Sequence, residues 1–246
     1  NIKMGCNVIT TNNYYVTPNI LKRAGEETQF EELTQLSIDL AKEASKNYEV
    51  LVAGSFPPIE TSFRPDLTPK DEELCQFYSS IGSIMENQVD LILCETMSSI
   101  REGIQAASTA KQYSERVWLS WTTRGLNGEA LPSGESLINA INAANELNIE
   151  CQLINCVSMD LVTAQINTLK LAGKFGVFAN SCVLKNSIND LGEAFDIDEN
   201  HHANTVTVSP KEYALEAKKW IDKGAYVIGG CCSTGPEHIK EISKLI

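Results

Sequence analysis

Two adjacent cysteines close an apolar run near the end of the chain. Residues Ala225 to Gly229 are predicted to form a buried strand, and Gly230, Cys231 and Cys232 follow it directly. Neighbouring thiols at the end of a strand pack poorly, because one of the two side chains must point away from the core. Thiolates are good ligands for zinc and related metals. The pair therefore indicates a metal site, provided that another segment supplies a third ligand.

A third thiol, Cys156, directly follows the apolar run Cys151–Asn155. In a barrel of parallel strands the carboxyl ends face one central mouth, so Cys156 would meet Cys231 and Cys232 there. Three thiolates leave the fourth tetrahedral position of a zinc ion open, as in catalytic rather than structural sites. The alternative is that each cysteine is a small buried hydrophobic residue, which is the usual fate of a free thiol.

The other cysteines and the histidines suggest no second metal site. The remaining thiols are Cys6, Cys94 and Cys151 inside predicted strands, Cys75 in a predicted helix, and Cys182 just beyond a strand. No Cys-x-x-Cys pair occurs, and the chain has three histidines. The pair His201-His202 follows an acidic run and is interpreted as part of a polar loop.

Glu95 ends the apolar run Val89–Cys94 and has no basic residue near it in the sequence. A carboxylate at this place either caps the following helix or binds an ammonium group of a ligand. Ser98 and Ser99 already offer hydroxyl groups for the cap, which favours the second interpretation. Gly229-Gly230, with a helix start at Thr234, is also compatible with a phosphate-binding loop, and this is the rival to the metal site.

Strand-like and helix-like segments alternate along the whole chain, which predicts parallel βαβ units. The predicted strands are near-continuous apolar runs, typical of strands covered on both faces: Cys6–Thr10, Val50–Gly54, Val89–Cys94, Val117–Trp121, Cys151–Asn155, Phe175–Asn180 and Ala225–Gly229. Helix starts are indicated at Thr68-Pro69, Ser99, Ser133, Ser158, Ser209 and Thr234. Between Phe30 and Lys46 apolar residues recur with helical spacing.

Seven strands are one fewer than a closed (β/α)8 barrel needs, and an open nucleotide-binding sheet would show a glycine-rich turn after its first strand. No such turn is present. We therefore expect a (β/α)8 TIM-type barrel whose first strand is missing from the N-terminus of this sequence, with the predicted strands as the second to the eighth. No linker-like segment interrupts the chain, so residues 1–246 are predicted to form one domain.

Composition narrows the class of protein. The chain has 246 residues, 43% hydrophobic, with a net charge of −12 and a pI near 4.8. This acidic balance argues against general nucleic-acid binding, which needs a basic surface. No run of about 18 uncharged apolar residues predicts a membrane span, and the first residues do not resemble a secretory signal. We expect a cytoplasmic protein with reduced thiols that acts on small molecules, with a homo-oligomer left open.

Several motifs together resemble the homocysteine S-methyltransferase family, which includes betaine-, S-methylmethionine- and cobalamin-dependent enzymes. The resemblance rests on Gly229-Gly230-Cys231-Cys232, on Asn155-Cys156 upstream and on Pro236-Glu237-His238-Ile239 downstream, and it extends to Cys6–Asn12, Glu95-Thr96 and Phe178–Ser181. The Asp-Gly-Gly segment of the family's first strand has no counterpart here, which agrees with a missing strand.

The resemblance implies a zinc-bearing barrel with Cys156, Cys231 and Cys232 as metal ligands. It also implies that Glu95 holds the amino group of homocysteine and that Asn12 and Asn155 shape the same pocket. The implied reaction moves a methyl group from a small cationic donor, such as S-methylmethionine or betaine, to the homocysteine thiol, which gives methionine.

Aromatic residues near predicted strand ends are candidates for binding a cationic donor by cation–π attraction: Tyr14, Tyr15, Phe56 and Phe63. Two other functions remain open at this point. One is a barrel lyase or isomerase that binds a phosphate at Gly229-Gly230. The other is a non-catalytic barrel that binds thiols or stores metal.

Overall fold

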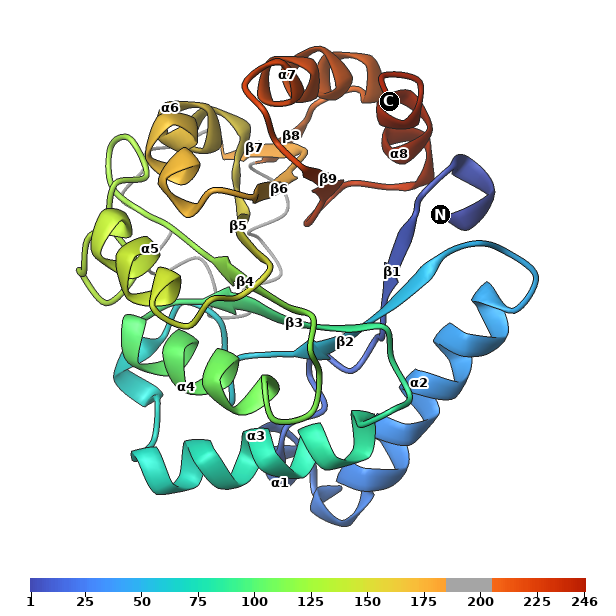
Figure 1. Cartoon of the computed structure of the whole chain (residues 1–246), viewed down its shortest axis with the longest axis vertical. Helices are drawn as coiled ribbons and strands as arrows, with labels where there is room; N and C mark the ends of the chain where they lie inside the picture. The colour runs from blue at the N-terminus through green and yellow to red at the C-terminus, as the bar shows by residue number, and fades with distance from the viewer. Residues whose placement is uncertain (185–204) are drawn as a thin grey trace.

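The computed structural model describes residues 1–184 and 205–246. Seven parallel strands form one curled sheet in the order β1-β2-β3-β4-β5-β6-β9, with helices around its convex side (Figure 1). The strands are β1 (Val8–Thr10), β2 (Leu51–Phe56), β3 (Leu91–Met97), β4 (Val117–Trp121), β5 (Cys151–Ser158), β6 (Phe175–Asn180) and β9 (Val227–Gly230). All seven predicted strands are therefore present, as is the predicted α/β alternation.

The helices connect successive strands and cover the sheet. They are α1 (Pro18–Ala24), α2 (Phe30–Ser45), α3 (Asp71–Met85), α4 (Ile100–Ala110), α5 (Leu137–Asn145), α6 (Met159–Leu169), α7 (Pro210–Asp222) and α8 (Pro236–Ser243), with 3-10 turns at Ile2–Met4, Glu27–Gln29, Pro65–Leu67 and Lys170–Ala172. The longest helix, α2, has 16 residues. No helix in the described ranges is both long enough and apolar enough to cross a membrane.

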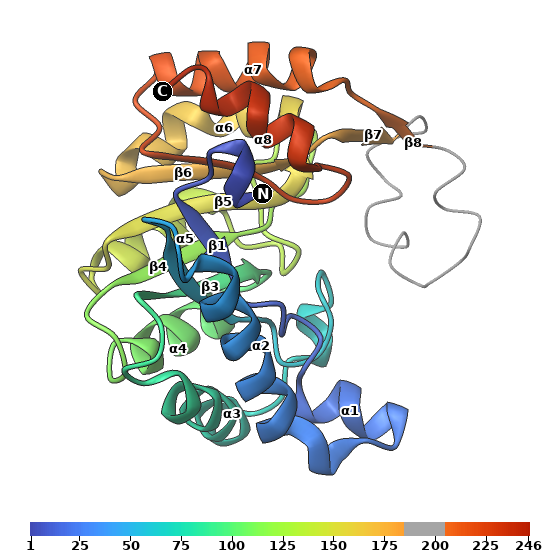
Figure 2. The ribbon, with the colours of Figure 1, turned by 90° about the vertical axis from the view of Figure 1, so that its right-hand side faces the viewer.

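The two ends of the sheet, β1 and β9, are not paired with each other in the described part of the chain. The sheet is therefore a curled half-barrel, open between the blue and the red strand of Figure 1. A short antiparallel pair, β7 (Cys182–Leu184) with β8 (Thr205–Thr207), follows β6 and extends away from the sheet (Figure 2). The sequence patterns did not predict this pair, because three-residue strands carry no periodicity.

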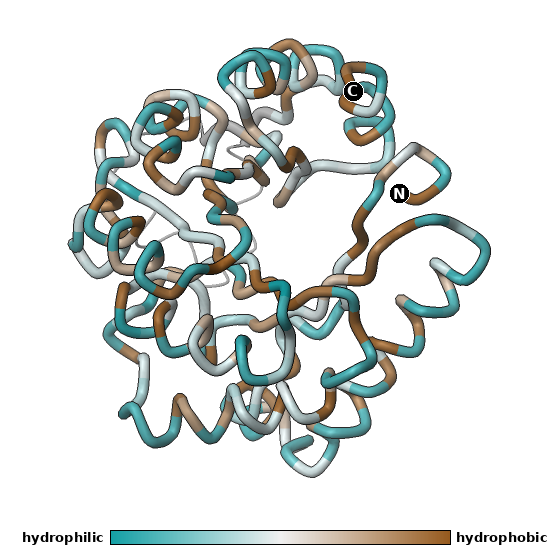
Figure 3. The backbone as a smooth tube through the Cα atoms, in the orientation of Figure 1, coloured by the Kyte–Doolittle hydropathy of each residue, from teal (hydrophilic) through white to brown (hydrophobic). Residues whose placement is uncertain are grey.

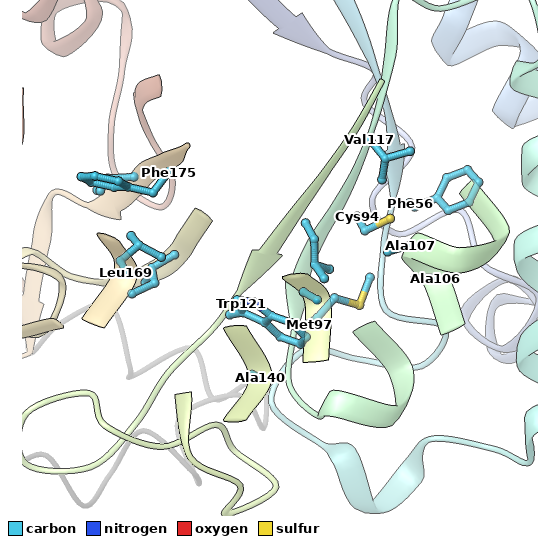
Figure 4. Close-up of a cluster of buried hydrophobic side chains, with 14 of the residues drawn as sticks. Phe56, Cys94, Met97, Ala106, Ala107, Val117, Trp121, Ala140, Leu169 and Phe175 are labelled. Atoms are coloured by element: carbon cyan, nitrogen blue, oxygen red, sulfur yellow. The ribbon is translucent and has the colours of Figure 1, made fainter. Parts of the chain in front are cut away.

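Most of the apolar core lies between the sheet and the helices. Figure 4 shows part of this layer, in which Phe56, Cys94, Met97, Val117 and Trp121 of the sheet lie near Ala106 and Ala107 of α4. The hydropathy colouring agrees, since hydrophobic stretches run along the sheet while the outer helices alternate between hydrophobic and hydrophilic residues (Figure 3). Strands that pack on both faces explain the continuous apolar runs in the sequence.

The concave side of the sheet is layered. The layer farther from the carboxyl ends of the strands is a second apolar cluster. It contains Ala53, Leu91, Leu93, Trp118, Cys151 and Leu153. Residues two apart in a strand share a face, so Ser55, Glu95, Ser120 and Asn155 follow on the same side, one step nearer the carboxyl ends. A polar layer therefore closes the apolar interior at the end where barrel enzymes carry their active sites.

Strands β3 and β5 run beyond their predicted ends. In each, the parallel register shifts: between Cys94 and Met97 in β3, and between Asn155 and Ser158 in β5. Each shift contains a non-glycine residue with positive φ, Thr96 at 60° and Cys156 at 59°. Such a bulge re-aims the side chains of the strand, and here it does so next to predicted site residues.

Several local predictions need correction. Ser99 and Ser209 cap α4 and α7 as predicted, whereas α5 is capped by Ser136 rather than Ser133. Helix α3 starts at Asp71, and the Thr68 hydroxyl donates to Glu102 instead of capping. The last helix begins at Pro236 after Gly235, not at Thr234.

Helix α2 forms over the predicted residues, but the apolar residues whose helical spacing predicted it, Phe30, Leu33, Leu36, Leu40 and Ala44, are not its buried face. Its buried residues are Thr34, Ser37, Ile38 and Ala41, while Leu36 and Leu40 are about half exposed. Small side chains let the helix lie close to the strands, so spacing alone pointed to the wrong side.

Candidate functional site

Three thiols meet at the carboxyl end of the sheet, as the sequence predicted. The sulfur atoms of Cys156, Cys231 and Cys232 all lie within 4.8 Å of one another, and those of Cys156 and Cys232 are 3.6 Å apart. Cys156 is buried, Cys231 is partly exposed and Cys232 is exposed. Within residues 1–184 and 205–246 this is the one group of three or more such side chains arranged to hold a metal ion.

The bulge in β5 gives Cys156 its orientation. Asn155 points to the concave side, so in a regular strand the next residue would point to the helices. The left-handed backbone of Cys156, with φ 59°, breaks this alternation. A non-glycine residue in this conformation costs free energy, on the order of 1–3 kcal/mol, and persists only where the surroundings hold it. The surrounding structure therefore holds Cys156 in a strained backbone conformation, and this conformation orients its thiol.

The segment after β9 carries the other two thiols and is held by its backbone. The N–H of Cys231 donates to the Ala179 carbonyl at 2.9 Å, and the N–H of Cys232 donates to Oδ1 of Asn180 at 3.0 Å. The Thr234 hydroxyl donates to the Cys231 carbonyl at 2.5 Å. These bonds fix the turn against β6, so both thiols are placed by the neighbouring strand.

The donor set fits a zinc ion. Ligands at the usual zinc–sulfur distance of about 2.3 Å in a tetrahedron lie about 3.8 Å apart, close to the separation of Cys156 and Cys232. The pKa of the Cys156 thiol is raised well above its usual value, first by its contacts with Cys231 and Cys232 and then by burial. Three thiols this close together, one of them buried, oppose one another's ionisation, so the cluster needs a cation to hold three thiolates.

The two glycines before the thiols are explained by packing rather than by a phosphate. A Cβ at Gly229 would lie 2.6 Å from the ring of Phe178, and one at Gly230 would lie 2.4 Å from Oγ1 of Thr234. A phosphate-binding loop needs free backbone N–H groups. Those of Cys231 and Cys232 already donate to β6, which counts against the phosphate interpretation.

Glu95 lies on the concave face and is the only residue of β3 that is partly accessible to solvent. Burial raises the pKa of Glu95 from its ordinary 4.5 to about 7, against the lowering effect of a hydrogen bond from Ser55. The Ser55 hydroxyl donates to Oε1 at 2.5 Å. Helix α4 is capped by Ser99, so the carboxylate of Glu95 is not used as a cap. It is desolvated but reachable, as a site for an ammonium group requires.

Buried polar groups at the end of β1 hold Ser55 in place. Oγ1 of Thr11 accepts from the Ser55 N–H at 2.9 Å and donates to Oδ1 of Asn13 at 2.6 Å. Nδ2 of Asn13 donates to the Ser55 carbonyl at 3.0 Å. The sequence prediction named Asn12, which is exposed, and missed the positioning roles of its two neighbours. The sequence carries no signal that separates them from Asn12, because all three residues are polar.

Asn155 also lies in the polar layer, 1% exposed. Its Oδ1 accepts from the Thr96 N–H at 3.0 Å and from the Ser120 hydroxyl at 2.7 Å, and its Nδ2 donates to Oγ1 of Thr96 at 2.7 Å. These bonds tie Asn155, the residue before Cys156, to Thr96, the residue after Glu95. Roles of Asn12 and Asn155 in substrate binding remain predictions.

Of the four aromatic candidates, two lie close to the cluster. Burial, followed by the charges of Glu95 and Cys156, raises the pKa of Tyr14 well above its usual value, and burial, followed by Cys156 and Cys232, raises that of Tyr15. The two rings meet edge to face at 5.2 Å. Tyr14 also hydrogen bonds to Ser62 in the loop after β2.

The other two aromatics lie elsewhere. Phe56 is fully buried on the helix side of the sheet and stacks on Tyr78 at 5.6 Å, so its proposed place near a donor is wrong (Figure 4). It alternates with Ser55, which takes the concave face. Phe63 lies in the loop after β2 with a positive φ of 67°.

The remaining histidine and cysteine predictions have mixed outcomes. Cys94 and Cys151 are buried in the core as predicted, and Cys75 is exposed on α3. Cys6 is partly exposed and precedes β1 rather than lying within a strand. His201 and His202 lie outside the described residues.

Comparison with known proteins agrees with the site. The family model for homocysteine S-methyltransferase matches residues 1–246. The chain belongs to the homocysteine S-methyltransferase family. This membership confirms the resemblance found in the sequence and the prediction that the chain is an enzyme of this methyltransferase type.

Individual members of the family are distant in sequence. Homocysteine S-methyltransferase 1 of Brassica oleracea var. italica is 27% identical over 273 residues, which cover 99% of this chain and 79% of that protein. Betaine--homocysteine S-methyltransferase 1 of Mus musculus is 24% identical over 258 residues, which cover 99% of this chain and 61% of that protein.

A solved structure shares the fold. The metallated form of the homocysteine methyltransferase MmuM from Escherichia coli matches with a TM-score of 0.76 and 24% identity, covering 99% of this chain and 81% of that one. At this identity the match supports the barrel-like α/β architecture.

Proposed function

We propose that this protein transfers a methyl group from a small cationic donor to the thiol of homocysteine, with a zinc ion held by Cys156, Cys231 and Cys232. The observation that carries the proposal is the pairing of two unlike sites on one face of the sheet. A cluster of three thiols fits zinc, and the desolvated but accessible carboxylate of Glu95 lies in the same polar layer. Homocysteine carries a group for each.

The acceptor binds through its two ends. Its ammonium group pairs with the carboxylate of Glu95, which Ser55 holds by one oxygen, so that the other oxygen remains for the ligand. Its thiol lies at the Cys156, Cys231 and Cys232 cluster. Asn12, exposed after β1, borders the same mouth. Binding at both ends orients the sulfur before reaction, and orientation of this kind contributes several kcal/mol to catalysis.

The bound metal supplies one effect, which is to keep the acceptor sulfur deprotonated at neutral pH, where a free thiol with a pKa near 8.5 is mostly protonated. A sulfur–carbon bond then forms to the methyl group as the bond between that carbon and the donor's sulfonium or ammonium centre breaks. The sulfur or nitrogen centre of the donor leaves as an uncharged thioether or tertiary amine. No side chain has to act as a general base in the transfer itself.

The aromatic pair Tyr14 and Tyr15 offers a place for the donor. Both rings lie near the thiol cluster, and Tyr15 is 58% exposed, so its ring is open to a ligand. A sulfonium or quaternary ammonium group is attracted to an aromatic face by cation–π interaction. S-methylmethionine and betaine both carry such a group.

An eighth parallel strand between β1 and β9 would close the barrel. Both edge strands carry apolar residues that are only partly buried, among them Val8 and Val227, and an unpaired edge leaves backbone groups without partners. A strand in this place would also form the remaining wall of the acceptor pocket. Residues 1–246 act in this proposal as a single barrel domain.

A donor screen tests the function. The complete, zinc-loaded protein is incubated with homocysteine and either S-methylmethionine, betaine or S-adenosylmethionine, and methionine is measured. We expect methionine from at least one cationic donor and none after zinc is removed with a chelator. Zinc binding without methionine from any of the donors would instead support a non-catalytic thiol- or metal-binding barrel. Stabilisation by phosphate, rather than by zinc, would support a phosphate-binding lyase or isomerase.

A further inference from the structure

Two strained bulges flank the site, and one side chain joins them. Thr96 in β3 and Cys156 in β5 have φ values of 60° and 59°, and each lies where the parallel register of its strand shifts. The two strands are not neighbours, since β4 lies between them. A connection between these bulges must therefore pass across a strand.

The amide of Asn155 makes this connection. It receives a hydrogen bond from the Thr96 N–H and gives one to Thr96 Oγ1, at 3.0 and 2.7 Å. On the way it accepts a bond from the Ser120 hydroxyl of β4 at 2.7 Å. Asn155, Thr96 and Ser120 are each 0–1% exposed. Both acceptor positions of the amide oxygen are thus occupied by protein donors, which leaves the side chain committed to the fold.

The connected residues sit beside the two halves of the proposed pocket. Glu95, the ammonium site, directly precedes Thr96, and Cys156, a thiol of the metal cluster, directly follows Asn155. Thr96 and Cys156 each have a strained backbone conformation, which relaxes readily if the contacts around it are lost. The bonds between Asn155 and Thr96 therefore hold the distance between the two halves.

We propose that Asn155 is a positioning residue that fixes the separation between the ammonium site at Glu95 and the thiol site at Cys156. The consequence concerns the acceptor class. An α-amino thiol of the right length occupies both halves at once and gains the advantage of a two-point ligand, whereas a thiol without the amino group occupies one half. This inference rests on the proposed function, because it assigns the acceptor to both halves.

The test measures acceptor binding rather than turnover. The complete protein is loaded with cobalt(II) in place of zinc, and binding of a thiol is followed by the change in the cobalt–thiolate absorption. Two ligands are titrated: homocysteine, and 4-mercaptobutanoate, which lacks only the amino group. The ratio of their dissociation constants measures how well the two halves act together. A Glu95→Gln variant gives the ratio expected when the ammonium site is lost.

Three variants separate positioning from general damage. Asn155→Ala removes all three bonds and is expected to lower the preference for homocysteine about tenfold, while affinity for 4-mercaptobutanoate changes less than about threefold. Thr96→Val keeps the shape and the N–H bond but removes the bond from Asn155 together with the contact of the Thr96 hydroxyl to Tyr14, and should lower the preference about threefold. The matched control, Ser120→Ala, removes a bond to the same oxygen without touching the link to Thr96, and should leave the preference unchanged.

Different results would overturn the inference. An equal loss of affinity for both ligands in Asn155→Ala would show damage to the thiol site alone, and an unchanged preference would show that the two halves keep their distance without the amide. If Asn155→Ala does not fold, the comparison of Thr96→Val with Ser120→Ala decides. Failure of the proposed function looks different, because the unaltered protein would then show no preference for homocysteine over 4-mercaptobutanoate.

Discussion

The two halves of the proposed pocket are stabilised in opposite ways. On the ammonium side, Glu95 is held by Ser55, which is held in turn by Thr11 and Asn13 through buried hydrogen bonds. These polar groups satisfy one another, so the side chains have their places before any ligand arrives. On the thiol side the cysteines crowd together, and at Cys156 these contacts and then burial raise the pKa and so oppose ionisation.

In the proposed function, this difference assigns the need for a cofactor to the thiol half. The ammonium half is preorganised by the chain itself, because buried polar groups are stable once their hydrogen bonds are made. The thiol half becomes a set of charged ligands only when a cation neutralises it. Loss of metal should therefore disable the thiol half and leave the ammonium half in place.

The largest expected effect is from removing a thiol. Cys231→Ala should lower zinc affinity by more than a hundredfold, because even changes behind the ligands typically cost about 10–100-fold, and methionine formation should be lost with it. Chelator competition measures the affinity. Cys75→Ala, which changes an exposed thiol on α3, is the matched control. A Cys231→Ala protein that still binds one zinc tightly would contradict the assigned ligand set.

Removing the negative charge of Glu95 should weaken homocysteine binding without affecting zinc binding. Glu95→Gln is expected to weaken homocysteine binding about 10–100-fold, the value of a hydrogen bond to a charged group, with zinc content unchanged. Titration of the cobalt-loaded protein measures the first and metal analysis the second. A parallel loss of zinc would mean that the two halves are not independent.

We also expect the Glu95→Gln substitution to change how the stability of the protein depends on pH. The pKa of Glu95 is about 7 in the folded protein and 4.5 ordinarily, so the folded state favours the protonated carboxyl and loses stability as pH rises from 4.5 through 7. Glu95→Gln avoids this loss. Urea unfolding of metal-free protein should show it more stable than the unaltered protein by up to about 3 kcal/mol at pH 8 and no more stable near pH 4. A constant difference across this range would contradict the assignment.

Ser55→Ala sharpens the comparison within the ammonium half. The bond from Ser55 lowers the pKa of Glu95, so without it the pKa rises further and the pH at which homocysteine binding improves moves upward. Affinity at neutral pH should fall up to about tenfold, while binding of 4-mercaptobutanoate stays the same. Ser120→Ala, whose hydroxyl bonds to Asn155 rather than Glu95, should leave the pH dependence where it is.

The last prediction tests the turn on the thiol side through stability rather than through ligand binding. Gly230→Ala places a Cβ 2.4 Å from the Thr234 hydroxyl, which itself holds the Cys231 carbonyl, and should lower stability by about 1–3 kcal/mol. Gly235→Ala is the control, because its φ of −120° suits any residue and no atom lies within 4 Å of the added Cβ. Equal unfolding midpoints for the two variants would show that the turn is less tightly packed than described.

The sequence determined the class of fold and the chemical groups of the site. Continuous apolar runs fixed all seven strands of the main sheet, and for β4 and β6 their ends as well. Cys156, Cys231 and Cys232 were identifiable because thiols at strand ends are unusual and because parallel strands bring their carboxyl ends together. Glu95 stood out in the same way, as a charge at the end of an apolar strand.

The tertiary structure decided the orientation and the partners of these groups. No sequence pattern announced the bulges at Thr96 and Cys156, since a left-handed residue that is not glycine is held by contacts rather than by its own preference. For the same reason the links from Asn155 to Thr96 and from Ser55 to Glu95, 59 and 40 residues apart in the chain, appear only when the strands are assembled into the sheet. The sequence by itself determined which chemical groups form the proposed pocket, and packing across strands determined how these groups are arranged.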